Sequence, residues 1–581
     1  MKVIKNILPI LVVLGFLYIA IKPLLMPGFF TIHDDEQVGR LYDLHLDVVT
    51  GHLPPRLSQN LGFGYDYPLF NFYPSFIYYV AEVYHLVGFS YIVSIKLMIV
   101  TGFILAALAM YFLSKEYFGK LAGVISAIIY TYASYHSIDV YVRGALPEFW
   151  SFVFLPAVFW SYTKLAKKPG SFFVIISGIF LAFFVLTHNL IALMSAPFIF
   201  CFLMYLFFIT KQRRRFVLST IFSGIIGICL SAYFWLPALL EKQYTMVGLL
   251  TTELADYAMH FVYPSQFWYS PWGYGGSTAG TGDGLSFQIG KVYLLCLIAV
   301  CVYALIILRK QRDKAALLFL LLSLFIFSLF MQTSYSKFIW DALQSILSYI
   351  QFPWRFLVLS FFLASFAIGA LFESPFVHFK DKKFIYAQFI IGFFIVITVL
   401  YRAVVTFNPT KYIVNAKDED YVSQKIMRWK TSNMAFEYVP KGIATKKSAR
   451  GNTVVNIKES QIAHAPFSII SGDMQIKVTK DIPQEKSAKI IVKKDGILQI
   501  NVFDFPGWQT FVDNKYVSYS GNNSFRLLRV PLIEGTHTVV AKFNDTFVRV
   551  VGNFLSGITA VGILFSGIYY LVLPRINKSK K

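Results

Sequence analysis

The chain has 581 residues, of which 56% are apolar, 18% are aromatic and only 14% are charged, and its mean hydropathy is +0.58. Soluble domains carry about 25% charged residues, so this composition excludes an ordinary water-soluble enzyme. The formal net charge of +22 would indicate a nucleic-acid partner only if the basic residues shared one soluble surface. The sequence therefore predicts a polytopic α-helical membrane protein.

Twelve apolar runs are candidates to cross a bilayer core of about 30 Å, which needs roughly 20 residues per helix. A shorter aromatic run, Ser75 to Val87, predicts an interfacial or re-entrant helix. The first long run follows Lys2 and Lys5 and lacks a small-residue cleavage pattern, so we expect a retained anchor. The twelve runs centre on residues 6–26, 91–113, 119–136, 147–163, 171–187, 189–210, 216–239, 290–308, 315–331, 355–372, 384–403 and 551–573.

The basic residues predict the orientation of these spans. With a cytoplasmic amino terminus, clusters such as Arg213 to Arg215 and the tail that ends at Lys581 face the cytoplasm, whereas the outer loops hold few basic residues. The positive-inside rule then predicts a multi-pass cell-membrane protein with both termini cytoplasmic. The positive charge is explained by topology and by attraction to anionic membrane lipids, so we expect no nucleic-acid partner.

We expect three parts along the chain. Residues 1–403 form a transmembrane catalytic module with long outer loops at 27–90 and 240–289. Residues 404–550 lack apolar spans and form one extracytoplasmic domain, and residues 551–581 form the last transmembrane helix and a basic cytoplasmic tail.

The second half of residues 404–550 alternates in strand fashion between turn signals, which predicts a β-sandwich. Their 21 basic and 13 acidic residues indicate a solvated surface, with no catalytic constellation. The expected strands are 489–493, 497–502, 509–513 and 537–543, and the expected turns are 494–496, 513–515, 521–523 and 534–535.

Three carboxylates, Asp34, Asp35 and Glu36, follow His33 just after the first span. Like charges crowded beside a membrane raise one another's pKa unless a metal ion, an arginine or a proton relieves them. One hypothesis is a general base or a metal ligand. The alternative is that Asp34 or Asp35 caps the helix that the following residues predict.

Further polar residues stand at the outer ends of other spans. Arg143 and Glu148 flank the start of the fourth run. Arg143 could bind a phosphate or could be an interfacial arginine, whereas a glutamate at the head of an apolar helix is costly unless it has a partner. His188 and Asn189 separate two apolar runs, where a histidine is either functional or a packing residue.

A tryptophan and an arginine, Trp354 and Arg355, open the tenth run, and the fork of the guanidinium group matches phosphate oxygens. The glycine-rich loop 271–284 lacks the Lys-Ser/Thr pair of a P-loop and follows no strand, so we expect a mobile lid rather than a nucleotide site. In that loop, Trp272 offers a flat face for a sugar or belongs to an interfacial belt, and Asp283 is a further polar candidate.

Together these segments resemble the GT-C superfamily of integral-membrane glycosyltransferases. The resemblance is greatest to the bacterial membrane proteins labelled "6-pyruvoyl-tetrahydropterin synthase-related" and to relatives that glycosylate cell-envelope polymers. The pterin label does not describe chemistry here, because the ten histidines lack the spacing of a zinc site. The resembling segments are 33–34, 51–56, 62–74, 143–148, 187–189, 272–277, 283–288, 352–355 and 505–513.

The resemblance implies inverting transfer of a sugar from a polyprenyl-phosphate donor to an extracytoplasmic glycopolymer or lipid of the cell envelope. It assigns the base to Asp34 or Asp35, with Glu148 also in the catalytic cavity. No cofactor is certain, although Mg²⁺ or Mn²⁺ could bind Asp34, Asp35 and Glu36. The residues expected to bind substrate or phosphate are His33, Arg143, His188, Asn189, Trp272, Asp283, Trp354 and Arg355.

The alternative function is a lipid-carrier flippase or a secondary transporter. Such a protein would place charged residues near the middle of the bilayer in broken helices, and it often has two matching halves. The sequence has neither feature, which favours the glycosyltransferase.

Overall fold

The computed structural model describes residues 2–373, 382–449 and 451–579, so Lys580 and Lys581 of the expected cytoplasmic tail lie outside the described residues. The chain divides into two compact units. The helical unit comprises Met1–Asp34, Lys96–Cys229 and Ala255–Ala416, and the mixed unit comprises Asp35–Ile95, Leu230–Leu254 and Lys417–Lys581. This division differs from the boundaries expected from the sequence, because most of the loop 27–90 shares a unit with residue 417 and beyond.

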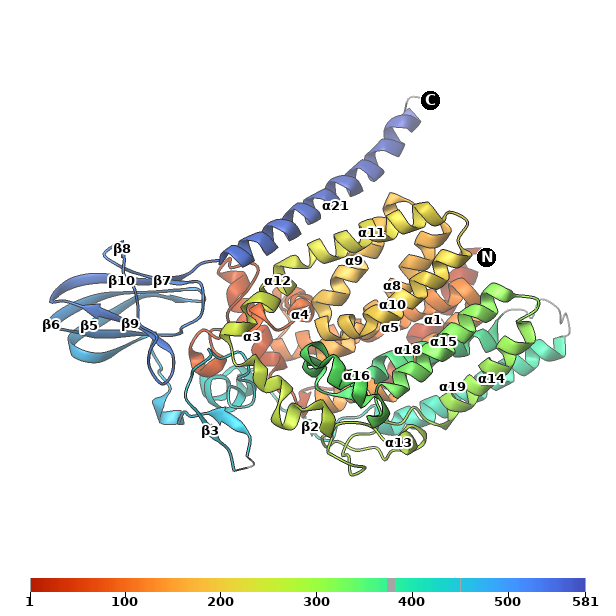
Figure 1. Cartoon of the computed structure of the whole chain (residues 1–581), viewed down its shortest axis with the longest axis horizontal. Helices are drawn as coiled ribbons and strands as arrows, with labels where there is room; N and C mark the ends of the chain where they lie inside the picture. Colours follow the sequence, from red (N-terminus) through yellow and green to blue (C-terminus); the bar gives the residue numbers. More distant parts are fainter. Residues whose placement is uncertain (1, 374–381, 450, 580–581) are drawn as a thin grey trace. The chain divides into compact units, whose positions relative to one another are not determined.

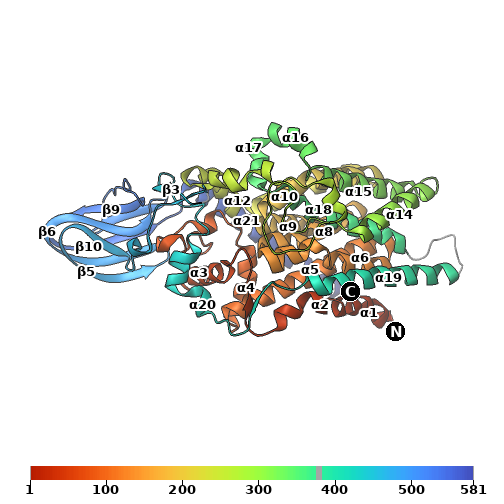
Figure 2. The same cartoon turned by 90° about the horizontal axis from the view of Figure 1, so that it is seen from below.

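The helical unit is a bundle built around α18 (Leu357–Ile368), every residue of which is buried. A helix that is apolar on all sides is stable only when neighbours surround it. It packs against α15 and α14, and these three helices lie side by side in Figures 1 and 2. The other elements of this unit are α1 (Lys2–Gly15), α2 (Tyr18–Ile21), β1 (Phe29–Phe30), α5 (Tyr91–Phe118), α6 (Lys120–Thr131), α7 (Ser134–Ser137), α8 (Leu146–Lys167), α9 (Ser171–Thr187), α10 (Asn189–Ile209), α11 (Arg213–Leu230), α13 (Pro264–Trp268), α14 (Lys291–Ile307), α15 (Arg312–Phe330), α16 (Lys337–Ala342), α17 (Gln344–Leu347), α19 (Lys382–Thr406) and β2 (Tyr412–Ile413), which pairs with β1.

Each of the twelve expected apolar runs contains helix. Among the described residues, six helices are long and apolar enough to cross a membrane, or eight if two bent pairs each count as one span. Three shorter apolar helices, α6, α9 and α14, coincide with further expected runs. The count of twelve crossings and their orientation stay predictions.

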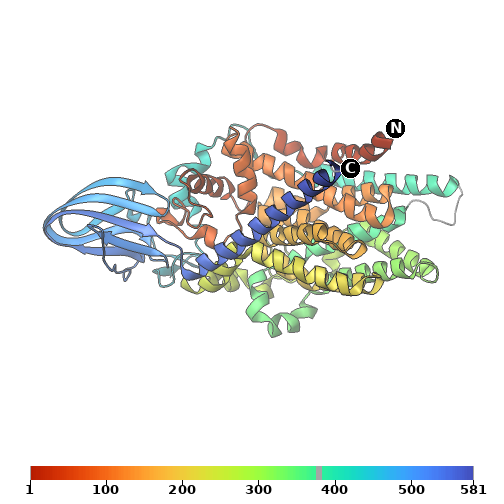
Figure 3. The same cartoon turned by 90° about the horizontal axis from the view of Figure 1, so that it is seen from above.

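The mixed unit combines short helices with an antiparallel sheet, shown in blue in Figures 1 and 3. The run at Ser75 to Val87 forms a helix, as expected, and it packs against α3. The elements are α3 (Gln37–Val49), α4 (Phe76–Leu86), α12 (Ala232–Glu241), α20 (Glu419–Val422), β3 (Thr445–Lys447), β4 (Thr453–Val455), β5 (Phe467–Ile482), β6 (Glu485–Phe503), β7 (Trp508–Val512), β8 (Lys515–Tyr516), β9 (Leu527–Leu532), β10 (Gly535–Phe543) and α21 (Phe547–Ser579).

The predicted β-sandwich is wrong, because the six strands form one sheet in the order β5-β6-β10-β7-β8, with β9 also paired to β6. The expected turn at 494–496 lies inside β6, which pairs with β10 up to Val492 and with β9 from Gly496. At this change of partner β5 and β6 approach closely, since a Cβ on Gly496 would lie 2.1 Å from the Ser471 carbonyl oxygen. A glycine here marks a close backbone approach rather than a turn.

The expected turn at 513–515 is confirmed. Asp513 and Asn514 have φ values of 51° and 65° between β7 and β8, as a type I′ hairpin requires. At 534–535 the connection lies one residue earlier than expected, because Ile533 and Glu534 join β9 to β10 and Gly535 is the first residue of β10.

The segment 62–74 of the loop 27–90 contacts the sheet within the mixed unit. The amide of Phe503 donates to the Tyr65 carbonyl oxygen at 2.8 Å. Asp66 and Lys486 form a buried ion pair at 3.1 Å. This part of the loop therefore anchors the sheet.

Replacing Gly496 with alanine should destabilise the sheet, because the added methyl group would force β5 and β6 apart. Such overpacking costs about 1–3 kcal/mol, which thermal unfolding of the full-length protein in detergent would detect as a lower midpoint. Gly276→Ala is the matched control, since a Cβ there would have no neighbour within 4 Å. Equal midpoints for the two variants would contradict this account of β6.

Candidate functional site

Four charged side chains form a buried cluster in the helical unit, here called the arginine–glutamate cluster: Asp139, Arg143, Glu148 and Arg355. Arg143 Nη1 lies 2.6 Å from Asp139 Oδ1 and 2.9 Å from Glu148 Oε2. Arg355 Nε lies 3.2 Å from the same Glu148 oxygen. Glu148 thus bridges two guanidinium groups that come from distant parts of the sequence.

The local sequence positions the first half of the cluster. Asp139 and Arg143 lie one turn apart on a π-helical segment, Ile138–Arg143, which ends at Gly144 with φ 72°. A Cβ on Gly144 would lie 2.6 Å from Ile32, so only glycine fits this turn. Helix α8 then begins, and Glu148 stands in its first turn, where the helix dipole favours a carboxylate.

Arg355 comes from the short helical turn before α18, and its Nη1 donates to the Ile350 carbonyl oxygen at 2.7 Å and to Gln351 Oε1 at 3.1 Å. Gln351 has a φ of 65°, a conformation that costs energy for a residue other than glycine and is often found at functional sites. Trp354 packs its ring 4.7 Å from the centre of the Arg143 guanidinium. The segment 351–355 therefore supplies one of the two guanidinium groups that pair with Glu148, and its Trp354 packs against the other, that of Arg143.

A tyrosine completes the contacts of Glu148, because Tyr135 donates to Glu148 Oε1 at 2.6 Å and accepts from Arg143 at 3.0 Å. Burial and the negative charge of Glu148 raise the pKa of Asp139 well above its usual value. Asp139 Oδ2 is buried without a hydrogen-bond partner in the described chain, which suits a protonated carboxyl group. Arg143 and Arg355 thus share Glu148, and Asp139 adds a second carboxyl group that pairs with Arg143.

His188 and Asn189 lie where α9 ends and α10 begins. His188 Nδ1 accepts from the amide of Ile191 at 3.2 Å and so caps α10. Burial lowers the pKa of His188 to about 3, opposed by Glu148, which keeps the ring uncharged. His188 therefore has a structural role, which is one of the two alternatives that the sequence allows, and it also interacts electrostatically with the cluster.

The segment 33–36, here called the acidic loop, starts on the turn that carries Arg143. The amide of His33 donates to the Val142 carbonyl oxygen at 2.9 Å, and the amide of Asp34 donates to that of Arg143 at 2.8 Å. His33 Nε2 also lies 2.8 Å from the Tyr274 carbonyl oxygen. Asp34, half-buried, is thus fixed beside the cluster by backbone bonds.

The boundary between the two units falls after Asp34, so Asp35 and Glu36 are described with the mixed unit. Glu36 is the N-cap residue of α3 and makes no side-chain capping bond, so the predicted capping role of Asp34 or Asp35 is wrong. Burial raises the pKa of Asp35 to about 6, with Lys430 opposing the shift. Within the described residues, no three His, Cys, Asp or Glu side chains are grouped to hold a metal ion, so the three acidic residues do not form such a group.

Asp283 orders the glycine-rich loop itself. Its Oδ1 accepts from the amide of Thr278 and its Oδ2 from Gln266 Nε2, both at 2.9 Å. Trp272 packs edge-on against Tyr274, with ring centroids 6.1 Å apart. The loop therefore meets the acidic loop through the Tyr274 carbonyl oxygen rather than through Trp272 or Asp283.

Sequence patterns alone do not single out Asp139, Tyr135 and Arg402. The spacing of Asp139 and Arg143, four residues apart, is a usable signal, since such pairs meet on a helix. Tyr135 gives none, because one more tyrosine among 36 carries little information.

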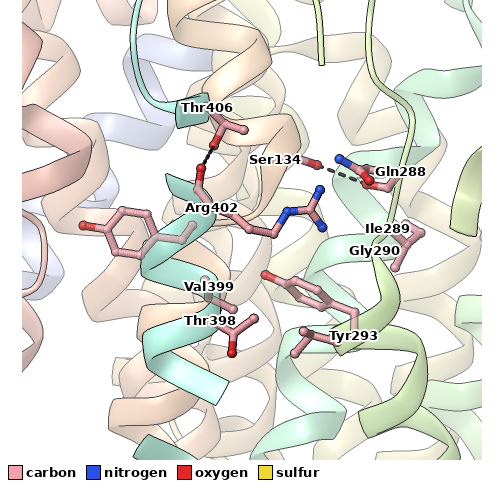
Figure 4. Close-up of a pocket in the computed structure, with 11 residues that line it drawn as sticks. Ser134, Gln288, Ile289, Gly290, Tyr293, Thr398, Val399, Arg402 and Thr406 are labelled. Carbon is pink, nitrogen blue, oxygen red and sulfur yellow. Dashed lines mark hydrogen bonds between the residues drawn. The ribbon is translucent and has the colours of Figure 1, made fainter. Parts of the chain in front are cut away.

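Arg402 lies in a groove between α19 and the start of α14, where its side chain points toward Tyr293 and Gln288 (Figure 4). It forms no ion pair with any residue in the described ranges. Ser134 Oγ donates to the Gln288 carbonyl oxygen at 3.1 Å, and Phe287 stacks on Trp354 at 5.7 Å. The two segments that line the groove, at Ser134 and Gln288, thus continue directly into residues that contact the cluster.

Comparison with protein families and with curated proteins gives no match. Among solved structures, the oligosaccharyltransferase of Archaeoglobus fulgidus in its apo form is 13% identical, with a TM-score of 0.45, over 76% of this chain and 62% of that one. Its complex with Zn and sulfate is 12% identical, with a TM-score of 0.38, over 69% of this chain and 53% of that one. The chain thus spans less than two thirds of that protein, and neither likeness is close enough to assign a function.

Replacing Glu148 with glutamine should strongly destabilise the helical unit, because it leaves two buried guanidinium groups without the carboxylate that they share. Breaking a buried pair in this way costs about 3–5 kcal/mol. Adding Arg355→Gln to the same chain removes one of the two positive charges and should recover part of the loss, measured as the thermal unfolding midpoint in detergent.

Glu116→Gln is the control for this comparison, because Glu116 pairs with Lys164 and Lys167 at a partly exposed position, and such pairs contribute about 0–1 kcal/mol. A double variant less stable than Glu148→Gln would show that Glu148 does not bridge the two arginines.

Proposed function

We propose that the protein is a membrane glycosyltransferase that moves a sugar, with inversion, from a polyprenyl-phosphate donor to an acceptor of the cell envelope outside the membrane. The observation that carries this proposal is the docking of an acidic loop, through His33 and Asp34, on a buried cluster with two arginines. The resemblance of the sequence to the GT-C superfamily supports it as well.

The reaction needs a base and a cation. The base takes the proton of the acceptor hydroxyl, whose oxygen attacks the anomeric carbon from the side opposite the phosphate. The bond between that carbon and the phosphate oxygen breaks, and the phosphate leaves with the electron pair. Positive groups already in place where this charge develops stabilise the transition state.

Asp35 is the proposed base. Its pKa of about 6 is close to the operating pH, where a general base is most effective. Glu36 is a poorer candidate because it is buried at the start of α3 and interacts with Arg40. Asp34 is bound through its backbone to the Arg143 turn, so it holds the loop from which Asp35 follows.

Arg143 and Arg355 are the proposed ligands of the leaving phosphate. Glu148 then positions both guanidinium groups instead of acting as a base, because its Oε2 already lies within 3.2 Å of each of them. His188, kept neutral by burial, and Asn189 shape the cavity without neutralising the phosphate.

Arg402 is the proposed first contact of the carrier phosphate. It lies near the end of α19, whose exposed apolar residues include Ile397, Tyr401, Val404 and Val405. Such a surface suits the prenyl chain of a lipid, and a cation at its end suits the phosphate.

Asp35→Asn should abolish transfer of radiolabelled sugar from synthetic polyprenyl-phosphate monosaccharides to envelope polymer by the purified protein. In the wild type, a base with a pKa of about 6 is protonated at lower pH, so transfer should rise as the pH increases through 6 and then level off. Asp473→Asn, at an exposed site on β5, is the control and should keep this profile.

Full transfer by Asp35→Asn would show that Asp35 is not the base. If only Asp34→Asn loses the rise of transfer with pH, the base is Asp34. Movement of the carrier across proteoliposomes without any transfer would support the flippase instead.

Arg402→Ala should raise the KM for the lipid donor about tenfold with little change in kcat, since the residue contacts the carrier before the reaction. Removing uniform binding has this kinetic signature. Arg215→Ala, at an exposed site elsewhere, is the comparison. A fall in kcat at unchanged KM would place Arg402 in the reaction itself.

A further inference from the structure

A second candidate site lies in the mixed unit, separate from the acidic loop and the cluster. It is a cleft of about 360 Å³ whose polar lining residues are Gln243, Tyr244, Lys441, Asp504, Tyr519 and Arg526. Ligand sites typically measure about 300–1,000 Å³, so the cleft can hold one small group or one unit of a longer chain.

Backbone hydrogen bonds fix one wall of the cleft. The amide of Lys441 donates to the Tyr244 carbonyl oxygen at 2.8 Å, and the amide of Met246 donates to that of Val439 at 3.0 Å. Thr245 and Pro440 form a β-bridge between these two bonds. Tyr244 and Lys441 are therefore held side by side although they come from distant parts of the chain.

The opposite wall is an ion pair with an unusual backbone. The amide of Asp504 donates to the Arg526 carbonyl oxygen at 2.7 Å, and the Arg526 guanidinium pairs with Asp504 Oδ2. Arg526 has a φ of 53°, and a Cβ on Gly521 would lie 2.1 Å from the same Asp504 oxygen. The chain thus accepts strain at one residue and requires glycine at another to hold this pair.

The pair retains capacity for a ligand. Tyr519 donates to Asp504 Oδ1 at 3.2 Å, and the Arg526 and Asp504 side chains are 31% and 19% exposed, so both groups can be reached from the cleft. A carboxylate and a guanidinium side by side both accept from and donate to vicinal hydroxyl groups.

Two further groups are available to meet a ligand. Tyr244 is 46% exposed, and an aromatic face packs well against the apolar face of a sugar ring. Lys441 is exposed and has no ion-pair partner within the described ranges, so its ammonium group is available to an anion such as phosphate.

We propose that this cleft binds a sugar phosphate unit of an acidic glycan. Tyr244 stacks on the sugar, Asp504 and Arg526 bind its hydroxyl groups, and Lys441 pairs with the phosphate. The excess of 21 basic over 13 acidic residues in 404–550 favours an anionic glycan over a neutral one. That this glycan is the acceptor rests on the proposed function, whereas its binding does not.

The test measures dissociation constants of glucose 6-phosphate, glucose and inorganic phosphate with the full-length protein in detergent, by ligand-observed NMR. Tyr244→Ala and Lys441→Gln should each weaken binding of glucose 6-phosphate at least tenfold. Lys441→Gln should leave the affinity for glucose unchanged, and Tyr244→Ala should leave that for phosphate unchanged. Tyr516→Ala and Lys489→Gln, at exposed positions of β8 and β6 outside the cleft, are the controls.

Unchanged affinity for glucose 6-phosphate in either cleft variant would overturn the proposal. Equal affinity for phosphate and glucose 6-phosphate would overturn it too, because the sugar would then contribute nothing to binding. The assay contains no donor, so failure of transfer does not affect it. Asp35→Asn should bind glucose 6-phosphate as the wild type does even where it abolishes transfer.

Discussion

The interaction on which the helical unit depends is the contact of one carboxylate, Glu148, with two guanidinium groups. Charges among apolar helices are expensive unless each is paired and hydrogen-bonded. Here the pairing needs three separate segments, namely the π-helical turn with Arg143, the first turn of α8 and the turn before α18. A local feature supports each segment: Gly144 allows the first turn, the helix dipole favours the carboxylate in the second, and the third contains Gln351 with a positive φ.

The Arg143 turn also holds the first two residues of the acidic loop, His33 and Asp34. The Arg143 turn offers two carbonyl oxygens, those of Val142 and Arg143, to the amides of His33 and Asp34. A loop held by main-chain bonds does not depend on its carboxylates for attachment. The Tyr274 carbonyl oxygen adds a third contact, and three chain segments thus meet beside the two arginines.

The sequence singles out three of the four residues of this cluster, but not their pairing. Charged residues at the ends of apolar runs are costly, so Arg143, Glu148 and Arg355 stand out in the sequence alone. The same reasoning misses Arg402, which lies inside the end of an apolar run and counts as part of the span. In the sheet, residues 494–496 have turn composition, yet they lie inside β6 because the strand gains new partners there. The composition of this segment is compatible with a turn, but its pairing with β5, β9 and β10 makes it part of a strand.

The two candidate sites differ in burial, and this difference bears on how each would treat an anion. The arginine–glutamate cluster is buried, so under the proposed function its guanidinium groups would act on a developing phosphate charge at a low effective dielectric constant. Lys441 and Tyr244 are exposed, so contacts there are weaker and exchange readily. Catalysis requires binding that is strongest in the transition state, and repeated modification of a polymer requires release after each step. Under the proposed function, the buried cluster suits the first requirement, and the exposed cleft suits the second.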